Sequence, residues 1–74
     1  MIYDVTLKGA PEPTVTGENL VVVAEYDGRD CRLLILDEQL IPHLRHWGYG
    51  DTVTVSANSS FYLGSIILEV RAIL

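Results

Sequence analysis

Hydrophobic and polar residues alternate with period two along much of this chain. Near the start, Tyr3, Val5 and Leu7 are separated by polar residues. This alternation predicts a β-strand with one buried face. The stretch 9–19 that follows contains prolines and glycines among Thr and Glu residues, a composition that predicts an extended loop.

A β-hairpin is predicted next. Residues 20–26 and 30–36 are rich in the β-branched and aliphatic side chains that favour strands. The dipeptide Asp27-Gly28 between them supplies the two positions of positive φ that a two-residue hairpin turn requires. Such a turn places Tyr26 opposite Arg29 across the hairpin.

The period of the pattern changes between residues 37 and 47, where apolar residues recur at i, i+4 and i+7. They are Leu40, Leu44 and Trp47. This spacing predicts a short helix that covers one end of a sheet. Because proline has no amide hydrogen, we expect the helix to start near Ile41 or Pro42 and to end at Gly48.

Two more strands are predicted towards the end of the chain. Over residues 51–57, apolar side chains alternate with hydroxyl side chains. The polar run 58–60 is expected to turn the chain, and Gly64 is expected to open a last strand over residues 65–74.

These elements predict one all-β domain over residues 1–74. Five strands with a short helix between the third and fourth is the order of a small Greek-key barrel of the OB type. An SH3-like barrel is the alternative, since it also has five strands and often one helical turn. The apolar stripe of the helix and its place in the order favour the OB type.

Composition narrows the class of protein. The chain is 49% hydrophobic, and its ten acidic against five basic residues give a net charge of -5. This composition is typical of a globular protein, and its acidity is opposite to the charge of an ordinary nucleic-acid binder. No long apolar run and no leader with a cleavage site is present in these residues, so a cytoplasmic location is expected.

Few residues indicate catalysis. Cys31 is the only cysteine, which excludes an intramolecular disulfide, and its place in an alternating strand predicts a small buried hydrophobe. His43 and His46 could share a metal, but without a strict ligand motif we expect them to be solvated, with no metal bound. No catalytic triad order or phosphate-binding loop is present, so no cofactor and no enzymatic activity is expected.

The last third of the chain, residues 51–74, resembles the end of the single-stranded DNA-binding gene V proteins of filamentous phages. A Thr/Val strand, a Ser-Ser-Phe segment and a Gly-Ser pair before an aliphatic strand occur there in the same order. Met1-Ile2 and Leu36-Asp37-Glu38 are similar too, so the likeness touches about half the chain. Gly50-Asp51 and the Thr-Val repeat after it are also similar to the RNA-binding OB domain of bacterial translation initiation factor one.

Both resemblances imply an OB barrel that binds single-stranded nucleic acid, and the first implies a phage-like protein made in a bacterial host. In the gene V family, a basic wing carries arginines that grip phosphate. The corresponding loop here, residues 10–19, has no basic residue and contains Glu12 and Glu18. The family's stacking aromatic before Gly-Ser corresponds to Leu63, whereas Tyr26 matches a tyrosine of the family's DNA groove by its place in the hairpin.

Single-strand binders combine aromatic rings for base stacking with Lys or Arg for the backbone. Candidates for these roles lie at strand ends and in the loops where OB folds usually bind ligands. The predicted nucleic-acid-binding residues are Tyr26, Arg29, Arg32, Phe61 and Tyr62, with Lys8 and Tyr49 as further candidates. A plainer interpretation is that Phe61 and Tyr62 close the barrel mouth as part of its core.

The surplus of aliphatic residues predicts an assembly surface. If one face of each strand fills the barrel, five aliphatic residues point outward, and monomers seldom expose a large apolar patch. These predicted dimer-interface residues are Val21, Val23, Leu34, Ile67 and Ile73. A segment of the same subunit could instead cover them.

The leading hypothesis is a non-enzymatic homodimer that binds single-stranded nucleic acid, with DNA favoured by the phage resemblance. The alternatives are an acidic protein-protein interaction module or inhibitor, whose carboxylates face a basic protein partner, and a structural oligomer with no ligand.

Overall fold

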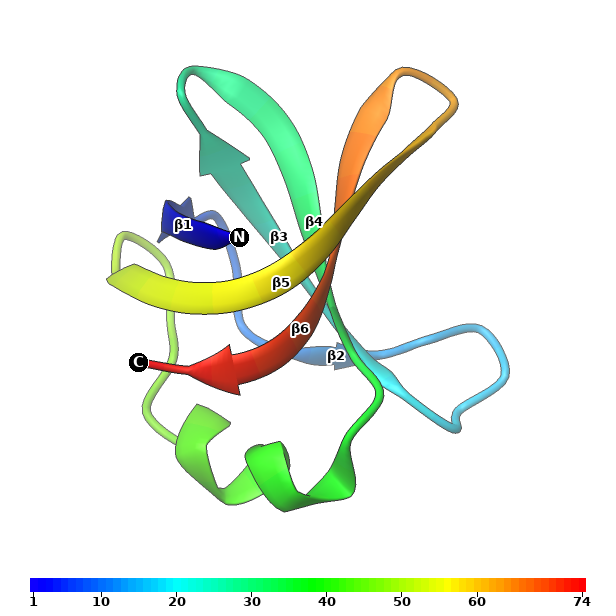
Figure 1. Ribbon diagram of the computed structural model, residues 1–74. Coiled ribbons are helices and arrows are strands. Elements are labelled where there is room, and N and C mark those ends of the chain that lie inside the picture. The colour runs from blue at the N-terminus through cyan, green and yellow to red at the C-terminus, as the bar shows by residue number, and fades with distance from the viewer.

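The computed structural model describes residues 1–74 and contains six strands and one short helix, with five of the strands closed into a barrel (Figure 1). The elements in chain order are β1 (Ile2–Leu7), β2 (Glu12–Pro13), β3 (Leu20–Tyr26), β4 (Arg29–Ile35), the 3-10 helix η1 (Glu38–Leu44), β5 (Thr52–Tyr62) and β6 (Ser65–Ile73). The two-residue strand β2 lies in the predicted loop and pairs with β3 at the edge of the sheet, a position where Pro13 is tolerated.

The other five strands close into a barrel. Their order around it is β1, β5, β6, β4 and β3, and pairing of β1 with β3 completes the circuit. Strands β4 and β6 pair in parallel, whereas the other neighbours are antiparallel. This is the small five-stranded Greek-key barrel of OB type expected from the sequence, with the helix between its third and fourth strands.

The interior of the barrel is entirely apolar. Its centre is the row Val22, Leu33 and Leu68, three neighbours on adjacent strands that are each 0% exposed. No polar or charged residue is buried. The complete set of buried residues is Tyr3, Val5, Leu7, Val22, Ala24, Cys31, Leu33, Ile35, Leu44, Val55, Ala57, Leu68 and Val70. Period-two alternation therefore identified most of the core, whereas Leu44 comes from the helical segment.

The first hairpin turn is confirmed. Asp27 and Gly28 have φ angles of 52° and 77°, and Tyr26 pairs with Arg29 across the turn. Asp tolerates this left-handed conformation better than most residues, and glycine has no steric cost there. The sequence therefore fixes the register of β3 against β4.

The predicted turn at residues 58–60 is wrong. Strand β5 continues through these residues to Tyr62, and the chain turns at Leu63 and Gly64, with φ angles of 49° and 81°. Cross-strand pairing outweighs the turn preference of the polar run, since Ser59 lies opposite Leu68. A leucine in this conformation costs roughly 1–2 kcal/mol, a cost that the long β5–β6 ladder offsets.

The helix also starts earlier than predicted. Element η1 begins at Glu38, directly after Asp37, whose side-chain oxygen accepts a hydrogen bond of 2.9 Å from the Gln39 amide. Because 3-10 turns are short and use i to i+3 bonds, they tolerate the donor missing at Pro42. The apolar spacing correctly identified residues that face the core, since Leu44 is buried and Leu40 and Trp47 pack against it. The predicted end at Gly48 is wrong, because η1 ends at Leu44 and Trp47 lies beyond it. No helix of this chain has the length and apolarity to cross a membrane.

Strand β6 contains a bulge that changes which side chains face inward. Ala57 pairs with Val70 but Ser56 pairs with Ala72, so Arg71 is an extra residue on β6. The shift places Ile73 opposite buried Val55, and Ile73 packs against the core. The prediction that Ile73 points outward is therefore wrong.

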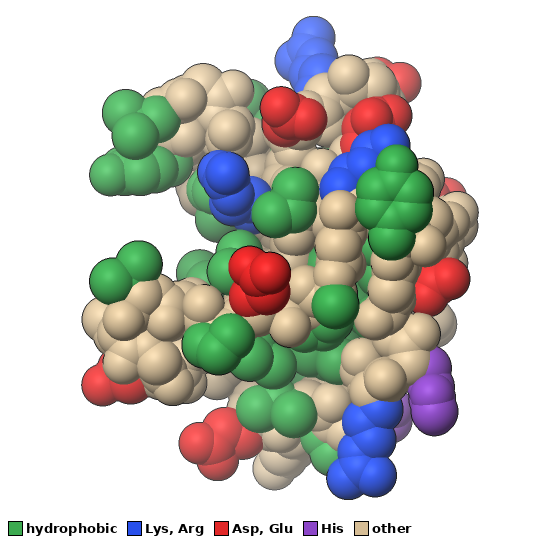
Figure 2. Space-filling view, turned by 180° about the vertical axis from the view of Figure 1, so that it is seen from behind, with side chains coloured by type: hydrophobic (Ala, Val, Ile, Leu, Met, Phe, Trp, Pro, Cys, Tyr) green, Lys and Arg blue, Asp and Glu red, His purple; other side chains and the backbone are tan.

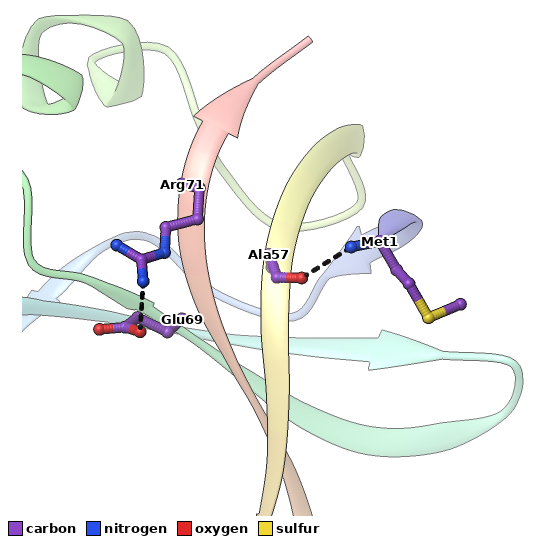
Figure 3. Close-up of polar contacts among 4 residues, drawn as sticks. All are labelled: Met1, Ala57, Glu69 and Arg71. Carbon is purple, nitrogen blue, oxygen red and sulfur yellow. Dashed lines mark hydrogen bonds and ion pairs between the residues drawn. The ribbon is translucent and has the colours of Figure 1, made fainter.

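The start of the chain lies on the other side of β5 from β6. Ala57 binds Met1 twice through its backbone: its amide donates to the Met1 carbonyl at 2.9 Å, and its carbonyl accepts from the Met1 amino group at 3.2 Å (Figure 3). Strand β5 is thus held on both edges, which supports the long hairpin that it forms with β6.

Candidate nucleic-acid interface

Two hairpins extend beyond the closed part of the barrel as separate arms (Figure 1). The parallel pairing of β4 with β6 starts at Cys31 and Ile66. Beyond this point the two hairpins are not paired with each other, and they diverge. We call residues 25–30 the β3–β4 arm and residues 59–66 the β5–β6 arm.

Strand alternation separates the five predicted binding residues into two groups, because successive side chains point to opposite faces. Phe61 pairs with Ile66, which packs against the core, so Phe61 continues the interior-facing side of its arm. Tyr26, which packs against the core, and its pair Arg29 continue the interior-facing side of the other arm. We call Tyr26, Arg29 and Phe61 the mouth surface.

The mouth surface contains one fixed ring and one free ring. Tyr26 is half-buried and meets Tyr3 edge to face, with ring centroids 5.1 Å apart and planes at 79°. Phe61 is 74% exposed, and Tyr62 next to it is 68% exposed. These two aromatics are not part of the core, so the plainer interpretation of them is wrong. The sequence did not indicate Tyr3 as the support of Tyr26, because only the closed barrel brings β1 to β3.

The structure places Arg32 and Tyr62 on the opposite side from the mouth surface. Arg32 alternates with buried Cys31 and Leu33, and Tyr62 alternates with Phe61. The five predicted binding residues therefore do not form one surface. Tyr26, Arg29 and Phe61 share a side, whereas Arg32 lies among the residues predicted for dimerisation.

Four of the five predicted interface residues come together on the outside of β3, β4 and β6. Val21 pairs with Leu34, and Val23 pairs with Arg32, which lies beside Ile67. We call this surface the outer face; it consists of Val21, Val23, Arg32, Leu34, Ile67 and Glu69. Seen from behind, hydrophobic side chains gather in a hollow between two projecting loops, with cationic and anionic side chains among them (Figure 2).

Lys8 and Tyr49 form a separate group. The Lys8 ammonium lies 5.8 Å from the centre of the Tyr49 ring and 3.4 Å from a Glu25 carboxylate oxygen. The Lys8 amide donates to the carbonyl of Val23, which places this residue at the end of β1 beside the outer face. Its charge is thus partly neutralised, and it does not contribute to the mouth surface.

The charge on the β3–β4 arm is mixed. Arg29 lies between Asp27 and Asp30 in the sequence and forms no ion pair. Any electrostatic attraction for phosphate at the mouth surface is therefore local and weak, in keeping with the net charge of -5.

The remaining candidates do not form a reactive centre. No three His, Cys, Asp or Glu side chains are grouped as metal ligands, and the surface has no enclosed pocket. His43 and His46 are exposed at the end of η1 and just beyond it. Cys31 is buried, and desolvation raises the pKa of its thiol to about 11, with smaller contributions from the charges of Asp30 and Glu25.

The raised pKa predicts an inert thiol in the folded protein. Because only the thiolate reacts, native Cys31 should be alkylated by iodoacetamide roughly 100-fold more slowly than an unfolded cysteine at about pH 8. Mass spectrometry with and without denaturant measures this ratio.

The raised pKa also makes the stability of the fold depend on pH. The folded pKa lies above the ordinary value of 9.0, so the stabilising contribution of the neutral thiol is complete below about pH 9 and is lost as the pH rises to 11. Equal alkylation rates for Cys31 in the native and the denatured protein would contradict the predicted difference in reactivity.

Comparisons with protein-family models, with curated proteins and with solved structures found no match to this chain. The resemblance to the gene V proteins stays a prediction from short motifs. The mouth surface and the outer face are thus the features of this protein that bear on its function.

Proposed function

We propose that this protein is a non-enzymatic binder of single-stranded DNA that acts as a homodimer, with the mouth surface as the site that holds bases. The observation that carries the proposal is the exposed Phe61 ring on the same side as the half-buried Tyr26 ring and the unpaired Arg29. These three residues lie on two arms of an OB-type barrel, a fold that usually binds ligands at its loops.

Base stacking supplies most of the affinity in this proposal. Every base has an aromatic face, and stacking on a protein ring contributes about 1–3 kcal/mol per base. Tyr26 is held at a fixed angle by Tyr3, so little ordering of that ring accompanies binding. Phe61 has most of its surface free to cover with a base.

Phosphate contacts have a minor role, because Arg29 is the one cation of the mouth surface. Each phosphate neutralised on a single strand contributes a slope of about −0.7 to the logarithmic salt dependence. We therefore expect affinity for an oligonucleotide to fall less than about tenfold between about 50 mM and about 200 mM salt.

Phe61→Ala is expected to weaken the binding of labelled oligo(dT) by about 5- to 150-fold, because it removes one stacking ring from an exposed position. Fluorescence anisotropy titration at both salt concentrations measures the effect. Tyr49→Ala is the matched control, since Tyr49 is equally exposed, at 76%, but lies outside the mouth surface. Its affinity should equal that of the wild type.

Two results would overturn this function. The first is no oligonucleotide binding by the wild-type protein at low salt. The second is equal affinities for the wild type and Phe61→Ala, which would show that the mouth surface does not hold bases. The first result would leave an acidic module for a basic protein partner as the next function to test, with carboxylates such as Asp27 and Asp30 in the interface. The second would leave DNA binding in place but exclude the mouth surface as its site.

A further inference from the structure

The outer face has an apolar diagonal crossed by a charged one. On β4 and β6, Arg32 lies beside Ile67, and two residues along each strand Leu34 lies beside Glu69. These four side chains form a quadrilateral in which Leu34 and Ile67 occupy one diagonal and Arg32 and Glu69 the other. Val21 and Val23 extend the apolar area onto β3.

No segment of the chain covers this quadrilateral. Val23 is 41% exposed, and Leu34 and Ile67 are only half-buried although they lie in the middle of the sheet. Helix η1 closes one end of the barrel through Leu44 rather than covering its side. The hollow in Figure 2 is thus an open sheet face with an apolar centre.

The two charges of the quadrilateral are poorly satisfied within one chain. Arg32 forms no ion pair, although it is flanked by apolar side chains. Glu69 has a single ion pair, a distance of 3.8 Å to Arg71, whose side chain is 62% exposed (Figure 3). An exposed pair of this length contributes little, so Glu69 is available to a better partner.

We infer that the outer face binds a second copy of this chain about a two-fold axis that runs along the Leu34–Ile67 diagonal. Rotation about this axis exchanges the ends of the other diagonal, so Arg32 of each copy meets the partner's Glu69. The apolar diagonal meets itself, and two symmetric ion pairs form at its sides. A face on which opposite charges lie on either side of an apolar line is complementary to itself in this way.

This inference rests on the homodimer of the proposed function but not on its DNA ligand. The outer face and the mouth surface point to opposite sides of β3 and β4, so both can be occupied together. The molecule measures 27 × 24 × 22 Å, so one face offers each partner up to roughly 600 Å² to bury. This area per partner is near the lower end for specific interfaces. We therefore expect the dimer to dissociate in the micromolar range.

Charge reversal tests the pairing. Arg32→Glu and Glu69→Arg are each expected to raise the dissociation constant at least about tenfold, because each places like charges together in both symmetric pairs. An equimolar mixture of the two variants should form a heterodimer, since both of its pairs are then complementary. The double variant Arg32→Glu/Glu69→Arg should regain the homodimer. Sedimentation equilibrium at tens of micromolar measures these four samples and the wild type.

Arg45→Glu is the control, because Arg45 is an exposed arginine after η1, away from the outer face, and its charge reversal should leave the dimer unchanged. A monomeric wild type, dimers that persist in both single variants, or a mixture that stays monomeric would each overturn the inference. Oligo(dT) binding is measured separately on the same samples. A short oligonucleotide that fits one mouth surface should still bind the monomeric variants, so failure of the dimer is distinguishable from failure of the DNA site.

Discussion

Leu33→Ala is expected to destabilise the protein by about 2–5 kcal/mol, the range for removing a fully buried leucine. Leu33 is 0% exposed, pairs with Val22 on β3, and lies beside Leu68 on β6. A domain of this size has a total stability of roughly 4–11 kcal/mol, so this one substitution removes a large part of it. Urea denaturation followed by circular dichroism measures the loss.

Leu36→Ala is the matched control, because Leu36 follows β4 and is 42% exposed. Its free energy of unfolding should fall by less than about 1 kcal/mol. Equal losses for the two variants would contradict the barrel interior as described, because they would place Leu33 and Leu36 in similar environments.

Tyr3→Ala is expected to have an effect of similar size, about 3–5 kcal/mol, the range for truncating a large buried aromatic. Tyr3 is 7% exposed and is the ring against which Tyr26 packs. Its loss should also weaken oligo(dT) binding, since Tyr26 is no longer held at a fixed angle. Thermal unfolding and anisotropy titration below the unfolding temperature measure the two effects.

Tyr3→Phe separates the ring from its hydroxyl. The hydroxyl has one weak partner, the Met1 sulfur at 3.9 Å, so its removal should cost less than about 1 kcal/mol and leave binding unchanged. A large loss of binding in Tyr3→Phe would show that the hydroxyl, rather than the packing of the two rings, is the important group.

The sequence predicted those parts of the fold that depend on local chemistry. Asp27-Gly28 requires a tight turn wherever it lies in the barrel, and the alternation of strands near it identified buried residues such as Leu33. The turn at Leu63 was missed because leucine does not favour positive φ, and the polar run 58–60 is a better local signal. Pairing of β5 with β6 determines where the chain turns, and this pairing cannot be read from the residues of β5 alone.

The candidate site was predicted in its residue types but not in its grouping. A one-residue change of register moves every side chain to the opposite face of a strand. Because the turn after β5 was predicted too early, the sequence did not show which face of the sheet Phe61 and Tyr62 occupy. The bulge at Arg71 places Ile73 on the inner face, opposite to the prediction. The diagonal placement of Arg32 and Glu69 on one face depends on the parallel pairing of β4 with β6. These strands are more than thirty residues apart in the sequence, and no sequence motif signals their pairing.

The central claim is that the mouth surface holds single-stranded DNA. Its most direct test is a titration of isotope-labelled protein with unlabelled oligo(dT), followed through the backbone amide resonances. The account predicts that the amides of Tyr26, Arg29 and Phe61 shift while those of Val23, Leu34 and Glu69 stay in place. Shifts confined to the outer face, or no shifts at any concentration of oligonucleotide, would contradict it.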